Sequence, residues 1–534
     1  MSAPARDPAH RFLVDPGLGA RVQPHRSIAR DCCAPGLCAR LTANAPECAG
    51  MFLELDGHGP QYAQLVRALK SSILDGRMLA GSRLPPTREF ALNLGVSRTT
   101  VLAAYEQLRA EGFINGRVGS GSYVSGLQLT PSLPRPSDAE DAAASRYAER
   151  ARQFRERKIA RLHYGLRYEL RYGDPLTNPA LNAAWGRELA RAAAYSSLGI
   201  TGSWGLPALR QQICEYLARR RGLQARAEDI LIVTGTQQAY ALCARVLLDE
   251  GDTAVLEEPH YFGAYHVLAA HGAQLHPVRC DDDGLVCDEL PEQAPKLICV
   301  TPSHQFPTGA VLSLPRRLEL LRYAAEKRCW IIEDDYDGEF RYDAHPLAAL
   351  RSLDDGDRVI YAGTFSKTLF GTLRMGYLVM PEALRADLTT AKYLSDVSSP
   401  GIEQAALAHF MESGGFERHL RHARKELQTR REALIAGLRR YAGDRVDIVH
   451  SPAGMHVVAW LNGYSHERAE ELMWHAHDRG LGLYSMAPHY FVPPERPGLL
   501  LGYCNLSVAE LRDAMQLLGE CLDAVPALAA EMAP

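Results

Sequence analysis

The chain has 534 residues, of which 46% are hydrophobic and 23% charged, and its 59 basic and 63 acidic side chains leave a formal net charge of −4. This length exceeds what one hydrophobic core usually supports, so at least two domains are expected. The near-neutral balance excludes a protein that is basic throughout, so any nucleic-acid contact must come from a local cluster of charge. With no run of eighteen apolar residues and no apolar signal core, we expect a cytoplasmic protein without membrane contact, whose cysteines are reduced.

Residues 1–50 mix proline, alanine, arginine and cysteine without a helical or strand period, and this composition predicts a disordered extension. Four of the twelve cysteines lie here, namely Cys32, Cys33, Cys38 and Cys48. A metal cluster is one alternative, but the spacing contains no paired two-residue gap and no histidine lies within the cluster. Another alternative is that Met51 is the true start. We therefore predict that a chain beginning at Met51 binds its ligands normally.

Residues 51–125 are predicted to form one small domain that begins with three helices. Apolar side chains between positions 62 and 73 recur every three or four residues, which predicts an amphipathic helix. Thr87 is expected to cap a short second helix, which Gly95 ends. Ser97 is expected to cap a third helix whose first turn is exposed.

Two short β-type runs, around 113–114 and 122–124, follow the third helix and are joined by a glycine-rich turn. Three helices and a hairpin predict a winged helix-turn-helix. Between Pro60 and Ser125 there are eight Lys or Arg residues and four acidic ones. This domain is therefore positively charged inside a negatively charged chain, as expected of a surface that binds nucleic-acid phosphates.

The domain resembles the GntR family of bacterial winged-helix regulators. The segments that carry the resemblance are 81–89, 94–101, 108–113 and 119–122. The resemblance implies that the partner is double-stranded DNA, and we expect Arg88 and Arg98 to meet phosphates or guanine edges. The predicted DNA-contacting residues are Arg88, Arg98, Thr99, Thr100 at the mouth of the third helix, and Gly119 and Ser122 in the wing. The alternative is a small helical domain with scattered surface arginines.

Residues 126–160 are predicted to be a linker. Its first part, 126–137, is studded with proline, and the rest alternates acidic, basic and alanine residues. A semi-rigid tether of this kind lets two domains report on each other without sharing a core.

Residues 161–534 are predicted to form an α/β domain. Short apolar runs alternate with helical patterns; the runs lie at 230–233, 253–256, 296–300, 329–332 and 359–361, and two of the helices at 236–249 and 315–327. Continuously apolar strands separated by helices predict a mostly parallel sheet that is covered on both faces. Ligands of such sheets bind at the carboxyl ends of the strands.

One stretch at such a strand end, residues 361–376, suits a cofactor that bears an aldehyde and a phosphate. It places Lys367 between small hydroxyl residues, with Arg374 seven positions later. A lysine amine condenses with an aldehyde as a Schiff base, while hydroxyl and guanidinium groups bind phosphate oxygens. Pyridoxal 5'-phosphate (PLP) is therefore the expected cofactor. Taken alone, the stretch also fits a surface lysine followed by a helix.

Three other strand ends carry groups that match this cofactor. The turn at 234–238 leads into a helix whose free N–H groups form an anion site. Tyr261 is placed to stack on a planar heterocycle, although a core tyrosine fits the same pattern. The acidic cluster at 333–339 offers a carboxylate for a pyridine nitrogen, and a divalent-metal site is the alternative.

The order of these groups resembles that of fold-type-I PLP-dependent aminotransferases. By this resemblance Lys367 is the Schiff-base lysine, Asp334 the partner of the pyridinium nitrogen and Tyr336 the partner of the ring's 3-oxygen. Tyr261 is the stacking residue. The phosphate is bound by Thr236, Gln237, Thr364, Ser366 and Arg374.

A GntR-like head joined to an aminotransferase-like body resembles the MocR/GabR subfamily of transcriptional regulators. Further marks of the subfamily are the segments 301–309 and 333–342, and the resemblance covers residues 52 to 525. It implies a cytoplasmic homodimer, not an enzyme, that binds DNA and PLP and regulates genes of amine, amino-acid or vitamin B6 metabolism.

Three positions depart from the aminotransferase pattern. Phe306 replaces an asparagine that holds the 3-oxygen, Leu500 replaces an arginine that binds the substrate carboxylate, and Ile200 replaces a tyrosine that binds the partner subunit's phosphate. These departures favour a regulator over the alternative, an active aminotransferase that carries a DNA-binding head. Because leucine cannot bind a carboxylate, we expect the effector to be PLP itself or an amine without a carboxylate. Arg496 is the alternative partner for a carboxylate.

Overall fold

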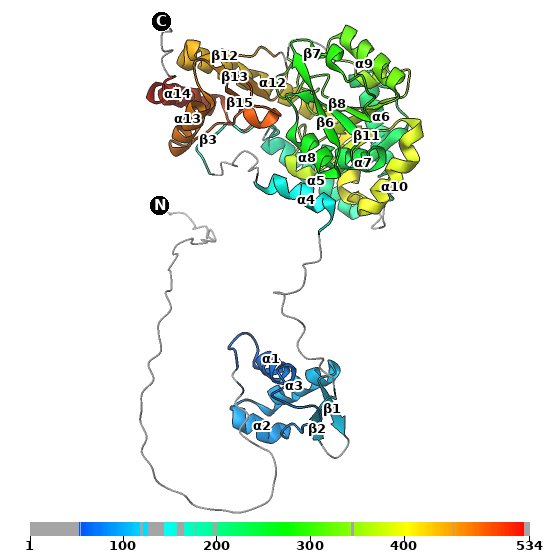
Figure 1. Ribbon diagram of the computed structural model, residues 1–534, viewed down its shortest axis with the longest axis vertical. Coiled ribbons are helices and arrows are strands. Elements are labelled where there is room, and N and C mark those ends of the chain that lie inside the picture. The colour runs from blue at the N-terminus through cyan, green and yellow to red at the C-terminus, as the bar shows by residue number, and fades with distance from the viewer. Residues whose placement is uncertain are drawn as a thin grey trace, which may run out of the picture. The chain divides into compact units, whose positions relative to one another are not determined.

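The computed structural model describes residues 53, 55–117, 121–126, 144–156, 165–176, 178–195, 199, 201–342, 347–451 and 453–527. The predicted extension at 1–50, most of the predicted linker, Gly119 and Ile200 lie outside these residues. The chain divides into two compact units, Met1–Asp141 and Ala142–Pro534, which we call the head and the body (Figure 1). No helix in the described part of the chain has both the length and the apolar character needed to span a membrane.

The head has the predicted order of three helices and a hairpin. Its elements are α1 (Gln61–Leu74), α2 (Thr87–Leu94), α3 (Arg98–Ala110), β1 (Ile114–Arg117) and β2 (Gly121–Val124), and the two strands pair antiparallel. The helices pack around one core to which Leu65, Leu69, Val101 and Leu108 contribute fully buried side chains. This arrangement confirms the predicted winged helix-turn-helix.

Local capping sets the boundaries of these helices. The side chain of Ser97 accepts a hydrogen bond from the backbone N–H of Thr100, as predicted for the cap of α3. Gly95 ends α2 in the left-handed conformation, with φ 65°. The predicted cap at Thr87 is wrong, because Thr87 is already the first helical residue and Pro86 occupies the cap position. The proline ring fixes φ, and its extended backbone suits the residue that precedes a helix.

The body is organised around a sheet of eight strands. Their order is β4 (Ile230–Val233), β11 (Gly376–Val379), β10 (Val359–Thr364), β9 (Trp330–Asp335), β8 (Leu297–Val300), β5 (Thr253–Glu258), β6 (Gln274–Asp281) and β7 (Gly284–Leu285). Strand β11 runs antiparallel to both of its neighbours and β7 runs antiparallel to β6, while the remaining pairs are parallel. The predicted mostly parallel sheet is confirmed.

Helices cover both faces of this sheet because successive strand residues point to opposite sides. Leu231 and Val233 pack with α7 (Thr236–Leu247), α8 (Phe262–His271) and α10 (Arg385–Asp396), of which α7 and α8 lie in front of the sheet in Figure 1. Ile230 and Ile232 pack on the other face. The helices of that face are α5 (Pro179–Tyr195), α6 (Pro207–Arg221), α9 (Leu314–Lys327) and α11 (Gly401–Glu412). Helix α4 (Arg146–Glu156) lies against α8.

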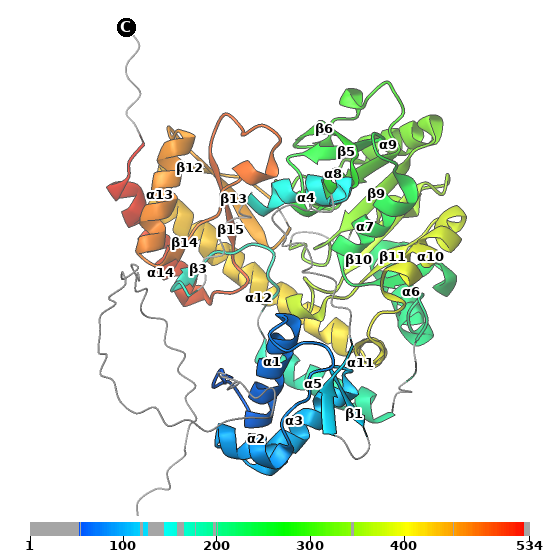
Figure 2. The same ribbon diagram turned by 60° about the horizontal axis from the view of Figure 1, so that its bottom comes forward.

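A long helix, α12 (Gly415–Gly437), leads from these layers to a second, smaller sheet. There β12 (Val446–Ile448), β13 (His456–Leu461) and β15 (Gly498–Gly502) pair antiparallel, β14 (Leu481–Gly482) pairs with β3 (Tyr168–Glu169), and α13 (His466–Asp478) and α14 (Val508–Ala524) pack beside them. We call residues 446–527 the C-terminal lobe. Figure 2 shows it beside the large sheet.

Candidate functional site

The predicted cofactor residues of the body lie at the carboxyl edge of the large sheet. Strands β9 and β10 are parallel neighbours, so Asp334 near the end of β9 and Lys367 just after β10 lie at the same edge. Tyr240 lies between Asp334 and Tyr261: its hydroxyl is 3.2 Å from Asp334 Oδ2, and its ring centroid is 6.4 Å from that of Tyr261. The site is therefore assembled from groups that are far apart in the chain, from Thr236 to Arg374.

Lys367 carries the only amine among the predicted cofactor residues. Its Nζ donates a hydrogen bond to the carbonyl oxygen of Gly173 at 2.5 Å. Burial lowers the pKa of Lys367 below its ordinary value, which favours the neutral, nucleophilic amine. Gly173 has φ 81°, and a Cβ atom there would lie 2.9 Å from Nζ. The sequence did not indicate this contact, because Gly173 lies far upstream in a segment that carries no motif.

Asp334 is a buried carboxylate with an unused oxygen. Its Oδ2 accepts a hydrogen bond from the hydroxyl of Tyr240 at 3.2 Å, while Oδ1 is buried and has no hydrogen-bond partner in the described structure. Burial raises the pKa of Asp334 to about 7. A cationic N–H donor placed at Oδ1 would satisfy this oxygen and favour the ionised form. Tyr240 was missed by the sequence reasoning, since on α7 it fits the pattern of an ordinary core residue.

Several groups that bind anions converge at the start of α7. Thr236 and Gln237 are its first two residues, and four N–H groups at a helix N-terminus lack intrahelical partners. Arg374 donates to the carbonyl of Thr234 at 3.1 Å, and a Cβ at Gly235 would lie 3.2 Å from its guanidinium, so the arginine lies against this turn.

The hydroxyl groups after β10 complete this set. Thr364 Oγ1 accepts the backbone N–H of Ser366 at 3.1 Å. Ser366 Oγ is buried and, among the described residues, has no hydrogen-bond partner. Gln237 differs from the others because its side-chain amide donates to the carbonyl of Gly263 at 3.1 Å. The structure thus leaves Ser366 with a free hydroxyl, whereas Gln237 is held by the neighbouring helix.

The predicted stacking residue, Tyr261, lies in an aromatic environment. Its ring centroid is 6.4 Å from that of Tyr240 and 5.8 Å from that of Phe306, and the Phe306 ring meets it edge-on at 88°. Phe262 also lies beside Tyr261, with ring centroids 5.3 Å apart at 47°, so these three neighbouring rings are tilted or perpendicular to Tyr261 rather than parallel to it.

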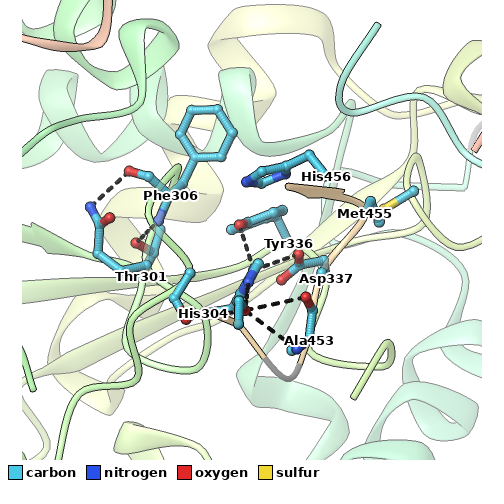
Figure 3. Close-up of polar contacts among 12 residues, drawn as sticks. Thr301, His304, Phe306, Tyr336, Asp337, Ala453, Met455 and His456 are labelled. Carbon is cyan, nitrogen blue, oxygen red and sulfur yellow. Dashed lines mark hydrogen bonds and ion pairs between the residues drawn. The ribbon is translucent and has the colours of Figure 1, made fainter. Parts of the chain in front are cut away.

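Tyr336 is connected to a buried network of polar groups that Figure 3 shows in close-up. Its hydroxyl lies 2.9 Å from Nδ1 of His304. The same nitrogen lies 2.8 Å from Asp337 Oδ2, and the other ring nitrogen, Nε2, lies 2.9 Å from Ser451 Oγ. The sequence reasoning quoted His304 and Asp337 only as members of motifs and gave no role to Ser451. Their proximity depends on the packing of three segments that are distant in the chain.

The surroundings of Leu500 are apolar. Leu500 is fully buried on β15 and packs in an apolar cluster with Phe306, Val458, Tyr484 and Met486. Arg496, the alternative partner for a carboxylate, lies elsewhere: its Nη2 donates to Asp447 Oδ2 at 2.7 Å, and its side chain is half exposed. Arg496 is therefore already paired with an acid at the surface of the C-terminal lobe.

The head presents its candidate DNA-binding residues differently. Arg88 and Arg98 are exposed, and the described structure gives neither of them an ion-pair partner. Three other cations of the head are ion-paired: Arg67 with Asp56, Lys70 with Glu111 and Arg77 with Asp75. Arg88 and Arg98 are thus the predicted contacts with charge available for a phosphate.

The small polar side chains of the predicted DNA surface have local partners. The hydroxyls of Thr99 and Thr100 each lie 2.7 Å from Ser97 Oγ. Ser122 Oγ accepts a hydrogen bond from Arg109 at 3.3 Å, which ties the wing to α3.

A divalent-metal site was the alternative interpretation of the acidic residues at 333–339, of which Glu333, Asp334 and Asp335 lie within β9. Within the described residues, no three or more His, Cys, Asp or Glu side chains are grouped so that they would hold a metal ion. Asp335 instead pairs with Arg221 at 2.5 Å, and Asp337 pairs with His304.

Comparisons with known proteins match both units. Residues 61–124 match the family "Bacterial regulatory proteins, gntR family", and residues 169–514 match "Aminotransferase class I and II". The chain is 36% identical over 480 residues to the probable rhizopine catabolism regulatory protein MocR of Rhizobium meliloti, covering 88% of this chain and 95% of that protein. It is 30% identical over 390 residues to the pyridoxine biosynthesis transcriptional regulator PdxR of Corynebacterium glutamicum, covering 72% and 81%.

Among solved structures, the body is similar to the α-aminoadipate aminotransferase LysN of Thermus thermophilus, complexed with N-(5'-phosphopyridoxyl)-L-leucine. The TM-score is 0.63 at 27% identity, and the match covers 72% of this chain and 97% of that one.

Proposed function

The chain belongs to the MocR-type family of GntR transcriptional regulators and is a DNA-binding regulator with an aminotransferase-like body, and we propose that the body binds PLP and reports its occupancy to the head. The observation that carries this proposal is the pair of buried, unsatisfied oxygens, Asp334 Oδ1 and Ser366 Oγ, at the sheet edge from which Lys367 follows β10. Buried polar groups without partners are unfavourable, so a ligand that satisfies both would be stabilised there.

The residues present fit PLP group by group. Asp334 would accept the pyridinium N–H, Tyr336 would donate to the 3-oxygen, and Tyr261 would stack on the ring. The phosphate would meet the N-terminus of α7, the free Ser366 hydroxyl and the Arg374 guanidinium. When bound, the cofactor supplies an aldehyde to which primary amines attach covalently, and Lys367 is the amine of this chain that lies at the site.

The apolar residues Leu500 and Phe306 limit which kind of effector the site can accept. Leu500 and Phe306 are buried apolar side chains that cannot pair with a ligand carboxylate, and an unpaired charge in apolar surroundings is strongly disfavoured. We therefore infer that the effector is PLP itself or an amine without a carboxylate. The name of PdxR, a regulator of pyridoxine biosynthesis, supports vitamin B6 metabolism as one class of regulated genes.

The deciding experiment measures the affinity of the cofactor-free and PLP-loaded full-length chain for the intergenic DNA beside its own gene. Each form is tested alone and with γ-aminobutyrate, glutamate or a simple primary amine. PLP alone, or PLP with the simple amine, is expected to change the affinity, which requires only that the ligand bind two states of the body unequally. An effect of glutamate or γ-aminobutyrate that PLP alone does not produce would contradict the proposed effector class.

An aminotransferase activity is the second candidate, because Lys367 and Asp334 have the positions that the chemistry requires. A regulator is favoured because the relatives MocR and PdxR are named as regulators, and because the buried Leu500 cannot pair with an amino-acid carboxylate. Steady turnover of an amino donor with a keto acid would establish the enzyme instead, whereas conversion limited to one equivalent per chain would agree with a sensor.

A further inference from the structure

His304 connects the site to the C-terminal lobe through both of its ring nitrogens. Nδ1 faces Tyr336 and Asp337, which follow β9 of the large sheet, whereas Nε2 faces Ser451, which lies between β12 and β13. The ring is almost completely buried, with 2% of its side chain exposed. Figure 3 shows the ring between the two segments.

The glycines around His304 fix the position of its ring. A Cβ on Gly454 would lie 2.3 Å from His304 Cε1, and a Cβ on Gly309 would lie 2.9 Å from Nε2. Both glycines have positive φ, at 98° and 81°, so larger residues are disfavoured twice, by conformation and by space. Because the ring cannot move freely, its hydrogen bonds depend mainly on which nitrogen carries the proton.

The chemistry of the neighbours indicates which nitrogen that is. An ionised carboxylate only accepts hydrogen bonds, so Asp337 requires a proton on Nδ1. In the neutral ring Nε2 is then an acceptor, and the Ser451 hydroxyl is the donor within reach. With its proton given to Asp337, Nδ1 cannot accept from Tyr336. The acceptors for the Tyr336 hydroxyl hydrogen are then the Asp337 carboxylate, whose hydrogen bond, after burial, helps to raise the pKa of Tyr336, and an oxygen of a ligand when one is bound.

Ser451 itself belongs to the C-terminal lobe and is held there. Its carbonyl accepts a hydrogen bond from Arg431 of α12, and the backbone N–H of Ala453 donates to its Oγ at 3.3 Å. A Ser-His-Asp series with these distances has the connectivity of a hydrolytic triad. Here all three residues are buried, and the hollow beside them has no space even for a water molecule, so the series has a positioning role.

We propose that His304 is a positioning residue that couples the hydrogen bond of Tyr336 to the placement of the C-terminal lobe. This inference rests on the proposed function, because the ligand that uses the Tyr336 hydrogen is the 3-oxygen of PLP. If the lobe moves away, Ser451 leaves and Nε2 becomes a buried acceptor without a donor, which is unfavourable. A ligand that fixes Tyr336 and His304 therefore also favours the placement of the lobe in which Ser451 donates. Such coupling is reciprocal, so the lobe's placement also changes the affinity for the ligand.

The test uses the full-length chain and two measurements after titration with PLP. The first is hydrogen exchange of the lobe segment 453–458, and the second is the pH midpoint of the cofactor's visible absorption. In the parent chain, PLP is expected to slow exchange in this segment about three- to tenfold, the range that one buried hydrogen bond contributes. Ser451→Ala and His304→Asn should both lose this protection, because each lacks the bond to the lobe. The matched control, Ser352→Ala, removes a hydroxyl that bonds only within its own turn and should keep the protection.

The second measurement, the pH midpoint, distinguishes the hydrogen bonds at Nδ1 of His304 from the one at Nε2. His304→Asn retains an N–H donor near the position of Nδ1, so it and Ser451→Ala should keep a midpoint close to that of the parent. His304→Phe removes the hydrogen bonds of both ring nitrogens. Asp337 then lacks the Nδ1 donor, so the Tyr336 hydroxyl should donate to Asp337 rather than to the 3-oxygen, and the midpoint should rise because the cofactor holds its proton more tightly.

Three outcomes bear on the inference. If Ser451→Ala folds, binds PLP and still shows the parent's protection of 453–458, the coupling is wrong. The same conclusion follows if PLP binds the parent chain without slowing exchange there. If PLP does not bind the parent chain at all, the proposed function fails and this inference fails with it.

Discussion

The head and the body present their candidate binding residues in opposite ways. In the head, Arg88 and Arg98 are exposed and no partner is found for them in the described structure, whereas in the body Asp334 and Ser366 are buried. Exposed charge meets a phosphate without a large desolvation penalty, and its attraction is screened by salt. Buried polar atoms interact strongly with a matching ligand but are unfavourable without one. We therefore expect DNA binding to respond to ionic strength, and PLP binding to respond to the loss of single buried groups.

The most severe change to the body is expected from Lys367→Ala. This variant lacks the amine that attaches to the aldehyde, so the visible absorption band of the cofactor should be lost completely while the chain still folds. Absorption spectra and mass measurement after borohydride reduction check both points. Retention of a reducible adduct at another lysine would show that Lys367 has been assigned wrongly.

The apolar cluster around Leu500 should contribute more to the stability of the fold than to the affinity for the cofactor. Leu500 is fully buried, so Leu500→Ala is expected to lower the free energy of unfolding by about 2–5 kcal/mol. PLP affinity, measured by titration at a temperature where the variant is folded, should change less than about threefold, a difference below 1 kcal/mol. A much larger loss of affinity would mean that Leu500 contacts the cofactor, so that the apolar cluster is part of the cofactor site.

Asp334 is expected to differ from Leu500 in that its replacement should stabilise the cofactor-free chain but weaken PLP binding. Burial raises its pKa from the ordinary value of 3.8 to about 7 in the folded, cofactor-free chain. Between these values the folded state binds a proton that the unfolded state does not, so the stability of the cofactor-free chain falls as pH rises through this window. Asp334→Asn removes this penalty, and the cofactor-free variant should gain about 1–3 kcal/mol at pH 8, with little gain at pH 4.

The same variant should bind PLP more weakly, because a neutral amide does not favour the protonated pyridine nitrogen. Thermal unfolding with and without PLP at both pH values measures the two effects together. If Asp334→Asn instead destabilises the cofactor-free chain at pH 8, burial of the ionised carboxylate is not unfavourable, contrary to this expectation.

In the head, Arg98→Ala is expected to weaken operator binding by about 1–3 kcal/mol if the guanidinium contacts a base edge. If the guanidinium contacts a phosphate instead, the slope of log affinity against log salt concentration should become shallower by about one unit. Arg77→Ala is the matched control, because Arg77 is exposed but already pairs with Asp75. DNA affinity measured across a range of salt concentrations distinguishes the cases. Equal effects of the two substitutions would mean that only the net charge of the head matters.

Sequence patterns were sufficient where the physics is local. The apolar spacing in α1 and α3, the cap at Ser97 and the glycine that ends α2 all depend on residues within a few positions of each other. The mostly parallel sheet followed from short apolar strands between helices for the same reason. Boundaries were less accurate: α7 ends at Leu247 rather than at 249, because Leu248 adopts an extended backbone.

The sequence also determined which residue types meet at the cofactor edge, since the ends of parallel strands share one side of a sheet. What only the tertiary structure decided is how those residues are partnered. Tyr240 bonding to Asp334, Gly173 to Lys367, and Ser451 and Asp337 to His304 involve segments up to 194 residues apart. No periodicity links such positions. Their contacts arise when the C-terminal lobe and the large sheet bury their surfaces together, which leaves a buried polar group only the partners that this packing supplies.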